Sequence, residues 1–261
     1  MTNPVNKMPL YFIGHGNPMY AITDNVYRKK WIELSTDIEI PEFILCISAH
    51  WYTRGTWVCL ADNPETIHDF GGFPDELYKV VYPAKGFRAK AEEISNNIQF
   101  AEIQKTEDWG LDHGAWSVLM NLFPKANIPV FQLSIDYTKP PEFHYQLGKE
   151  LAYLRESGCM VIASGNIVHN IRMAKWEKDA KPYDWALEFE NFAKSNIESG
   201  NSDNLVNYQK LGNTARLAHP ANDHYLPLLY ILGMVDKPDS ITFFNQGIDM
   251  GSMSMLSVKL T

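Results

Sequence analysis

Three of the eight histidines in this 261-residue chain follow short apolar runs that are typical of buried strands. The runs and the histidines that follow them are Pro9–Ile13 with His15, Phe43–Ser48 with His50, and Cys159–Ala163 with His169 after a glycine-containing turn. In open α/β sheets, ligands bind beyond the carboxyl ends of the strands. We therefore expect these three histidines to meet at one edge of a sheet.

Two further histidines, His113 and His224, lie at junctions between loops and helices, which share that rim in a doubly wound fold. Imidazole nitrogen suits zinc, copper, iron and nickel. Three histidine ligands with an open coordination position are typical of a catalytic metal site, whereas two histidines and a carboxylate point to non-heme iron(II). Asp69, Asp112 and Asp223 lie beside histidines, and the sequence leaves open whether each binds a metal or orients a ligand.

The remaining chain alternates short apolar runs with amphipathic stretches, which predicts an α/β fold. Strands are expected at Pro9–Ile13, Phe43–Ser48, Thr56–Leu60, Pro129–Ser134, Cys159–Ala163, Ile241–Phe244 and Ser252–Val258. Helices are expected over Asp24–Ser35 with Asp24 as N-cap, from Asp75, and over Phe87–Asn97, Ala115–Leu122, Pro140–Ser157, Trp185–Glu198 and His224–Leu232, with Asn201–Ala221 irregular. We predict one domain over residues 1–261, with a mostly parallel central sheet, helices on both faces, and a metal site at the C-terminal edge of the strands.

Composition argues against several classes of partner. The net charge is −8 and no basic stripe is present, so nucleic acid is not expected as a partner. No apolar run approaches the roughly 20 residues that span a bilayer, so no membrane contact is expected. The three cysteines form no CxxC pair, and with no signal peptide we expect a cytoplasmic protein. Walker, GxSxG and HExxH motifs are missing.

Seven motifs resemble those of one known family. They are GHGNPM at Gly14–Met19, SAHW at Ser48–Trp51, HDFGGFP at His68–Pro74, WGLDHGAW at Trp109–Trp116, SGNIVHN at Ser164–Asn170, DHYLPLLY at Asp223–Tyr230 and GSMSMLS at Gly251–Ser257. In this order they resemble the LigB-type class III extradiol ring-cleavage dioxygenases, and within them the group that acts on DOPA. The resemblance covers about residues 9 to 258.

The resemblance implies one divalent metal bound by His15, His50 and His224. It also implies an acid–base role for His169 and a second active-site histidine, His113, near substrate and oxygen. The reaction implied is insertion of O2 into the ring of a catechol to give a muconic semialdehyde, so a small aromatic diol and O2 are the expected partners. The sequence carries no prediction of the oligomeric state.

Aromatic and acidic residues beside the histidine motifs are candidates for substrate contacts. We predict substrate-binding roles for Trp51, Asp69, Phe70 and Tyr225, whose side chains could line a pocket for a planar ring or meet a charged group. Core packing is the alternative for the aromatic residues.

One feature departs from the better-known relatives, which use a carboxylate as third ligand where this chain has His224. An all-histidine set tolerates zinc well, but zinc has no redox chemistry, so Fe(II) is expected for activity and zinc is acceptable as a bound ion. Two alternatives stay open. The first is a zinc-dependent hydrolase of a small substrate, and the second is a non-catalytic binding module on the same fold.

Overall fold

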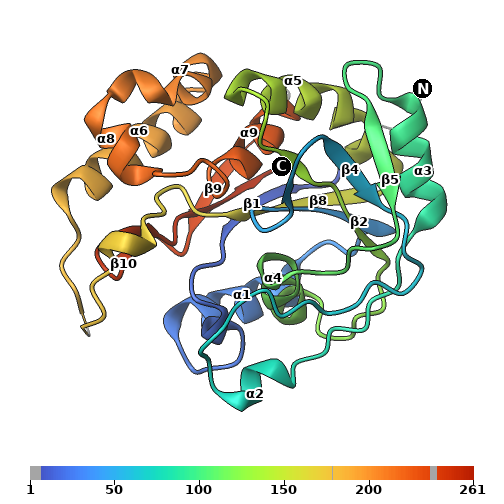
Figure 1. Ribbon diagram of the computed structural model, residues 1–261, viewed down its shortest axis with the longest axis horizontal. Coiled ribbons are helices and arrows are strands. Elements are labelled where there is room, and N and C mark those ends of the chain that lie inside the picture. Colours follow the sequence, from blue (N-terminus) through green and yellow to red (C-terminus); the bar gives the residue numbers. More distant parts are fainter. Residues whose placement is uncertain (1–6, 178, 236–239) are drawn as a thin grey trace.

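A mostly parallel sheet forms the centre of the computed structural model, which describes residues 7–177, 179–235 and 240–261 (Figure 1). Within these ranges the sheet has six strands in the order β6-β2-β8-β1-β12-β9. Their bounds are β6 (Val130–Gln132), β2 (Phe43–Ser48), β8 (Cys159–Gly165), β1 (Leu10–Gly14), β12 (Ser257–Leu260) and β9 (Ile241–Phe244). The first four strands pair in parallel, and β12 is antiparallel to both of its neighbours. The predicted mostly parallel sheet is confirmed.

In the described part of the chain, short strands outside this sheet form three two-stranded pairs. They are β3 (Tyr52–Thr53) with β7 (Ile135–Asp136), β4 (Thr56–Cys59) with β5 (Ile103–Thr106), and β10 (Ile248–Asp249) with β11 (Met253–Ser254). The predicted strand Ser252–Val258 is therefore divided between β11 and β12, which belong to different sheets, and the predicted strand Pro129–Ser134 is shorter in the structure, where β6 ends at Gln132.

Helices cover both faces of the central sheet, as predicted. The α-helices are α1 (Val26–Asp37), α2 (Asp75–Tyr78), α3 (Arg88–Asn97), α4 (His113–Leu122), α5 (Pro141–Leu151), α6 (Asp184–Glu198), α7 (Ser202–Val206), α8 (Asn213–Ala218) and α9 (Leu226–Gly233). The described residues also form the 3-10 helices η1 (Pro18–Ala21), η2 (Ala152–Ser157), η3 (Ile171–Met173) and η4 (Tyr208–Leu211). In Figure 1, α1, α2 and α4 lie on one side of the sheet and α5 and α9 on the other.

The central strands have no polar face because alternate side chains feed two separate cores. In β2, Phe43, Leu45 and Ile47 belong to the core that includes α5, α6 and α9. Ile44 and Cys46 belong to the core that includes α1 and α4. Both faces are therefore covered, and only the ends of the strands remain to carry a functional site.

Four local expectations about helices are wrong. The N-cap of α1 is Asn25 instead of Asp24, since the Asn25 side chain accepts a hydrogen bond from the backbone N–H of Arg28. The helix α4 begins at His113, two residues earlier than predicted, because Asp112 caps it. The helix expected to reach Ser157 is α-helical only to Leu151. The segment expected to be irregular over Asn201–Ala221 contains α7, η4 and α8.

The described residues contain no helix with both the length and the apolar character needed to cross a membrane. The single catalytic domain expected over residues 1–261 stays a prediction.

Candidate metal centre

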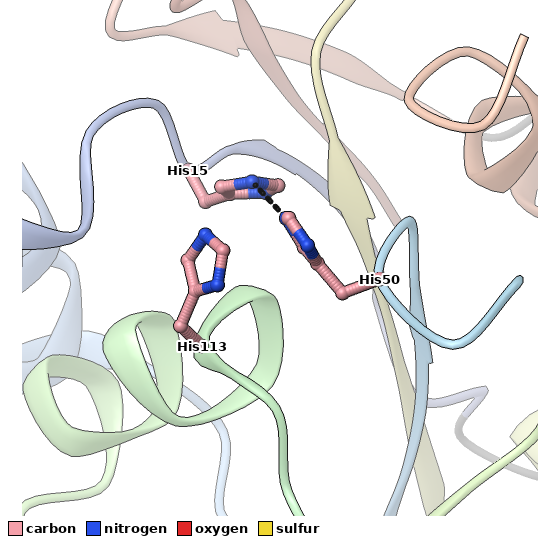
Figure 2. A group of neighbouring side chains, drawn as sticks. All are labelled: His15, His50 and His113. Carbon is pink, nitrogen blue, oxygen red and sulfur yellow. Dashed lines mark hydrogen bonds between the residues drawn. The ribbon is translucent and has the colours of Figure 1, made fainter. Parts of the chain in front are cut away.

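Parallel strand ends bring His15 and His50 together. The strand β8 lies between β1 and β2, with Gly14 opposite Gly165 and Ser48 opposite Ser164, so all three strands end at one level. His15 directly follows β1, and His50 lies two residues after the end of β2. Their Nε2 atoms lie 3.1 Å apart, and in Figure 2 the rings face a common space. The predicted convergence of these two histidines is confirmed.

The intervening strand β8 supplies a partner for the other nitrogen of His15. The Ser164 hydroxyl lies 2.9 Å from His15 Nδ1, and both residues are buried. A hydrogen bond at Nδ1 fixes which nitrogen of a histidine faces a ligand. Ser164 therefore directs Nε2 of His15 toward His50.

The start of helix α4 adds a third ring. His113 is the first residue of α4, and its ring centroid is 3.8 Å from that of His50. The next residue must be glycine, because a Cβ on Gly114 would overlap with the Ser48 hydroxyl. Asp112 holds the same junction, since its carboxylate accepts hydrogen bonds from Ser48 Oγ at 2.6 Å and from Gln132 Nε2 at 3.1 Å. Asp112 thus fastens α4 to the sheet instead of facing the cavity.

A single carboxylate, Asp69, orients two of these histidines. Asp69 Oδ2 lies 3.0 Å from His50 Nδ1, and Oδ1 lies 3.0 Å from His113 Nδ1. Burial raises the pKa of the Asp69 carboxyl, but the hydrogen bonds from His113 and His50 outweigh it and hold that pKa well below its ordinary value. A carboxylate only accepts hydrogen bonds, so both rings donate Nδ1–H and leave the Nε2 lone pair free. Both carboxylate oxygens of Asp69 therefore contact histidines, whereas the sequence predicted that Asp69 contacts the substrate.

His224 and His169 complete the ring of histidines from the opposite side. His224 lies two residues before α9, and its backbone oxygen accepts a hydrogen bond from Asn166 N at 2.9 Å. Gly165 permits this approach, because a Cβ there would overlap with the same oxygen of His224. The His224 ring centroid is 5.3 Å from that of His15 and 5.1 Å from that of His50. The His169 ring stacks on His224 with centroids 3.5 Å apart.

Burial keeps most of these rings neutral. Desolvation and the neighbouring imidazoles lower the pKa of His15 and His224 well below the ordinary value, and desolvation lowers the pKa of His169 to about 4. For His50, burial lowers the pKa, but the hydrogen bond to Asp69 and nearby carboxylates raise it overall. Neutral imidazole is the form that binds a metal ion.

This arrangement of nitrogen atoms fits a divalent cation. Among the described residues, two groups have ligand atoms within 4.8 Å of one another: His15, His50 and His113, and His169, Asp223 and His224. Two nitrogens bound to one ion at about 2.1 Å lie roughly 3 Å apart when they are adjacent ligands. The separation of His15 and His50 matches that spacing. His224 Nδ1 is buried and makes no hydrogen bond, although it lies 3.2 Å from Asp223 Oδ2.

A cavity of about 180 Å³ opens onto the histidines. It is lined by His15, Gly16, Asn17, Pro18, His50, Phe70, Phe73, His113, His169, Ile171, Trp176, His224, Met250 and Met253. Drug-sized ligands usually occupy roughly 300–1,000 Å³, so this volume suits a single small ring. All five histidines singled out from the sequence therefore share one cavity.

Two of the three aromatic residues predicted to contact substrate lie elsewhere. Phe70 lines the cavity, but Trp51 instead stacks on Trp109 with centroids 5.5 Å apart. Tyr225 is fully buried, and its hydroxyl donates to the backbone oxygen of Leu205 at 2.9 Å. Both of these aromatic residues have the packing role that was the alternative.

The other three histidines have partners away from the cavity. His144 is buried, and its Nδ1 lies 3.0 Å from the Tyr230 hydroxyl. His219 and His68 hydrogen-bond backbone oxygens. Sequence reasoning missed Ser164, whose signal is a polar residue at the end of an apolar strand. It also missed Trp176, for which the sequence has no signal.

Comparison with known proteins agrees with the geometry. A family model described as the catalytic LigB subunit of aromatic ring-opening dioxygenase matches residues 9–251. A protein of Escherichia coli K12 named 4,5-DOPA dioxygenase extradiol is 47% identical, with 97% of this chain and 95% of that protein covered. A protein of the same name from Beta vulgaris is 34% identical over 98% of this chain and 97% of its own length. The crystal structure of an uncharacterized Escherichia coli K12 protein superimposes with a TM-score of 0.86 at 41% identity, covering 98% of this chain and 100% of that one.

Proposed function

The chain belongs to the family of catalytic LigB subunits of aromatic ring-opening dioxygenases, and we propose that His15, His50 and His224 hold its metal ion. It is a metal-dependent extradiol dioxygenase, and the names of its relatives indicate DOPA as a substrate. The observation that supports this ligand set is the convergence of buried, mostly neutral imidazoles on one cavity at the strand ends. A small aromatic diol and O2 are its reactants.

We propose Fe(II) as the working metal, with Zn(II) able to occupy the same nitrogen ligands. When bound, Fe(II) would supply open positions for the diol and for O2 and the electron transfer that zinc lacks. The expected product of cleavage is a muconic semialdehyde.

His169 is the proposed acid–base residue. Burial keeps its ring neutral near pH 7, so it can accept a proton from a catechol hydroxyl that enters the cavity. Stacking on His224 holds the ring in place beside a proposed ligand. His113 has its Nδ1 engaged by Asp69, so its Nε2 is left to hydrogen-bond the substrate or oxygen.

Activity is tested by stripping the metal and reloading the protein anaerobically with Fe(II) or Zn(II). Oxygen uptake and visible absorbance are then followed with L-DOPA and catechol. We expect uptake and a yellow product with iron only, and loss of both in His169→Ala. A lack of uptake with stoichiometric iron would overturn the proposal, and ester hydrolysis with zinc would favour a hydrolase.

The ligand set is tested separately, because His113 also lies within ligand distance of His15 and His50. We expect His224→Ala to lose bound metal and His113→Ala to keep it, as measured by metal stoichiometry after dialysis. His68→Ala is the matched control, since His68 does not line the cavity. Metal loss in His113→Ala with retention in His224→Ala would assign the third ligand to His113.

A cytoplasmic location also stays a proposal. The three cysteines are free and buried, which fits a reducing compartment.

A further inference from the structure

The ring of His169 is held differently from the other histidines of the cavity. The Nδ1 atoms of His15, His50 and His113 each lie within hydrogen-bond distance of a hydroxyl or a carboxylate. Among the described residues, by contrast, no side chain forms a hydrogen bond with the ring of His169, which stacks on His224 with the two planes 5° apart. The position of the His169 ring therefore depends on where its own backbone lies.

The backbone of His169 is bonded to the segment that contains β11. His169 itself forms an isolated antiparallel bridge with β11. On one side of it, the N–H of Ser254 donates to the backbone oxygen of Val168 at 2.9 Å. On the other side, the N–H of Asn170 donates to the backbone oxygen of Ser252 at 3.1 Å. A shift of β11 would therefore carry His169 with it.

Within β11, Ser254 uses every polar group that it has. It is fully buried, and its backbone oxygen accepts a hydrogen bond from Asn166 Nδ2 at 2.7 Å. Its hydroxyl oxygen accepts one from the N–H of Leu256 at 3.2 Å and donates its proton to the carboxylate of Glu190. Ser254 thus joins the loop of His169 to helix α6, which carries Glu190.

The carboxylate of Glu190 is placed at a cost in free energy. Burial raises the pKa of Glu190, while the hydrogen bond from Ser254 and the charge of Lys194 lower it. Withdrawing a carboxylate from water is unfavourable unless hydrogen bonds compensate for it, so packing alone would be better served by an apolar side chain. Hydrogen bonds to a carboxylate are shorter and stronger than those between neutral groups. Glu190 therefore fixes the direction of the Ser254 hydroxyl.

We propose that Ser254, held by Glu190, is a positioning residue for the acid–base residue His169. The inference rests on the proposed function, in which His169 takes a proton from the catechol. Neither Ser254 nor Glu190 lines the cavity, so both act through the backbone around His169. Proton transfer needs the two heavy atoms within about 2.6–3.2 Å of each other, and a displacement of about 1 Å can lower a rate about 100-fold.

The kinetic test uses the Fe(II)-loaded full chain with L-DOPA. Ser254→Ala and Glu190→Leu should lower kcat and kcat/KM equally, by about 10- to 100-fold, because the step that His169 assists is impaired and substrate binding is not. Glu190→Gln should retain most of the activity, because its amide oxygen still accepts the hydrogen bond from Ser254. Ser117→Ala is the matched control, since Ser117 is equally buried but its hydroxyl has no partner.

A second measurement does not depend on turnover. The ring resonances of isotope-labelled histidines are recorded by NMR in the Zn(II)-loaded protein, with the His169 signal assigned by its loss in His169→Ala. We expect this signal to shift in Ser254→Ala and in Glu190→Leu and to keep its position in Glu190→Gln. The signals of His15 and His50 and the metal stoichiometry should stay unchanged, because these histidines are held by other partners.

The outcomes separate the positioning role from a general contribution to the fold. An unchanged kcat in Glu190→Leu, an unmoved His169 signal, or a loss of bound metal that accompanies the loss of activity would overturn the inference. Glu190→Leu decides the matter alone if Ser254→Ala does not fold. Absence of turnover by the natural sequence would overturn the proposed function instead, and the His169 signal would still report whether Ser254 positions the ring.

Discussion

Replacing Asp69 with asparagine tests whether one carboxylate sets the direction of two metal-site histidines. The side chain of Asp69 is 19% exposed and contacts Nδ1 of His50 and of His113, each at 3.0 Å. An asparagine has one oxygen and one NH2 group, so one of the rings would face a donor. That ring would have to accept at Nδ1 and carry its proton on Nε2, which removes a lone pair from the cavity.

The expected loss follows from the kind of bond that is removed. Hydrogen bonds to a charged group contribute about 1.5–3 kcal/mol each. Partners that orient metal-bound histidines typically change metal affinity or activity by about 10- to 100-fold when mutated. We expect the Asp69→Asn variant to bind Zn(II) or Fe(II) about 10- to 100-fold more weakly, as measured by competition with a chromophoric chelator.

A control separates orientation from a general loss of charge. Asp75→Asn removes an exposed carboxylate at the start of α2 and should leave metal affinity unchanged. Circular dichroism of both variants checks that they fold. If Asp69→Asn binds metal as tightly as the natural sequence, the carboxylate does not direct these rings and the argument is refuted.

Three further predictions concern stability. Gly148→Ala should destabilise the fold by about 1–3 kcal/mol in a denaturant titration, because a Cβ there would overlap with the backbone oxygen of Tyr230 where α5 meets α9. Gly71→Ala, with open space around it, is the control that should show no such loss. Burial lowers the pKa of His144 to about 4 from 6.5, so the unfolded chain binds more protons between these values. His144 should therefore contribute up to about 3 kcal/mol to the loss of stability as the pH drops from 6.5 to 4, and a His144→Gln variant with an equally steep loss would contradict this assignment. Removing metal with a chelator should lower the melting temperature, since a metal ion at 1,000 times its Kd stabilises the folded state by about 4 kcal/mol. An unchanged melting temperature would contradict a metal site that exists only in the folded protein.

The main strands could be predicted from the sequence because they are buried on both faces. The predicted strand Phe43–Ser48 has the same bounds as β2, because a continuous apolar run can be recognised without knowing which strands it pairs with. The short helices between residues 201 and 221 were missed because their sequence is polar. They are stabilised by packing, as where Tyr225 donates to Leu205, and such contacts depend on segments distant in the sequence.

Position next to a histidine was a poor guide to substrate contact. Trp51 follows His50 directly, but the chain turns after β2, where Trp51 N–H donates to Ser48 O, and the Trp51 ring stacks on Trp109. Tyr225 follows His224 at the start of α9 and is buried in the core, where its hydroxyl donates to the backbone oxygen of Leu205. Phe70 lines the cavity because its loop returns to the start of α4. The hydrogen bond from His113 N–H to Asp69 Oδ1 holds this loop against α4, and the sequence alone does not reveal that contact.

The all-histidine ligand set also bears on why an apolar cavity suits this chemistry. Three neutral imidazoles would leave a divalent ion with its full charge, whereas a carboxylate ligand would cancel part of it. The carboxylates beside the proposed ligands are Asp69, which contacts His50 through the nitrogen that faces away from His15, and Asp223, which lies 3.2 Å from His224 Nδ1. Because none of the described residues that line the cavity is Asp, Glu, Lys or Arg, an anionic catecholate would be the group inside it that balances the ion. The charge of the ion would therefore hold an anionic diol at the histidine end of the cavity.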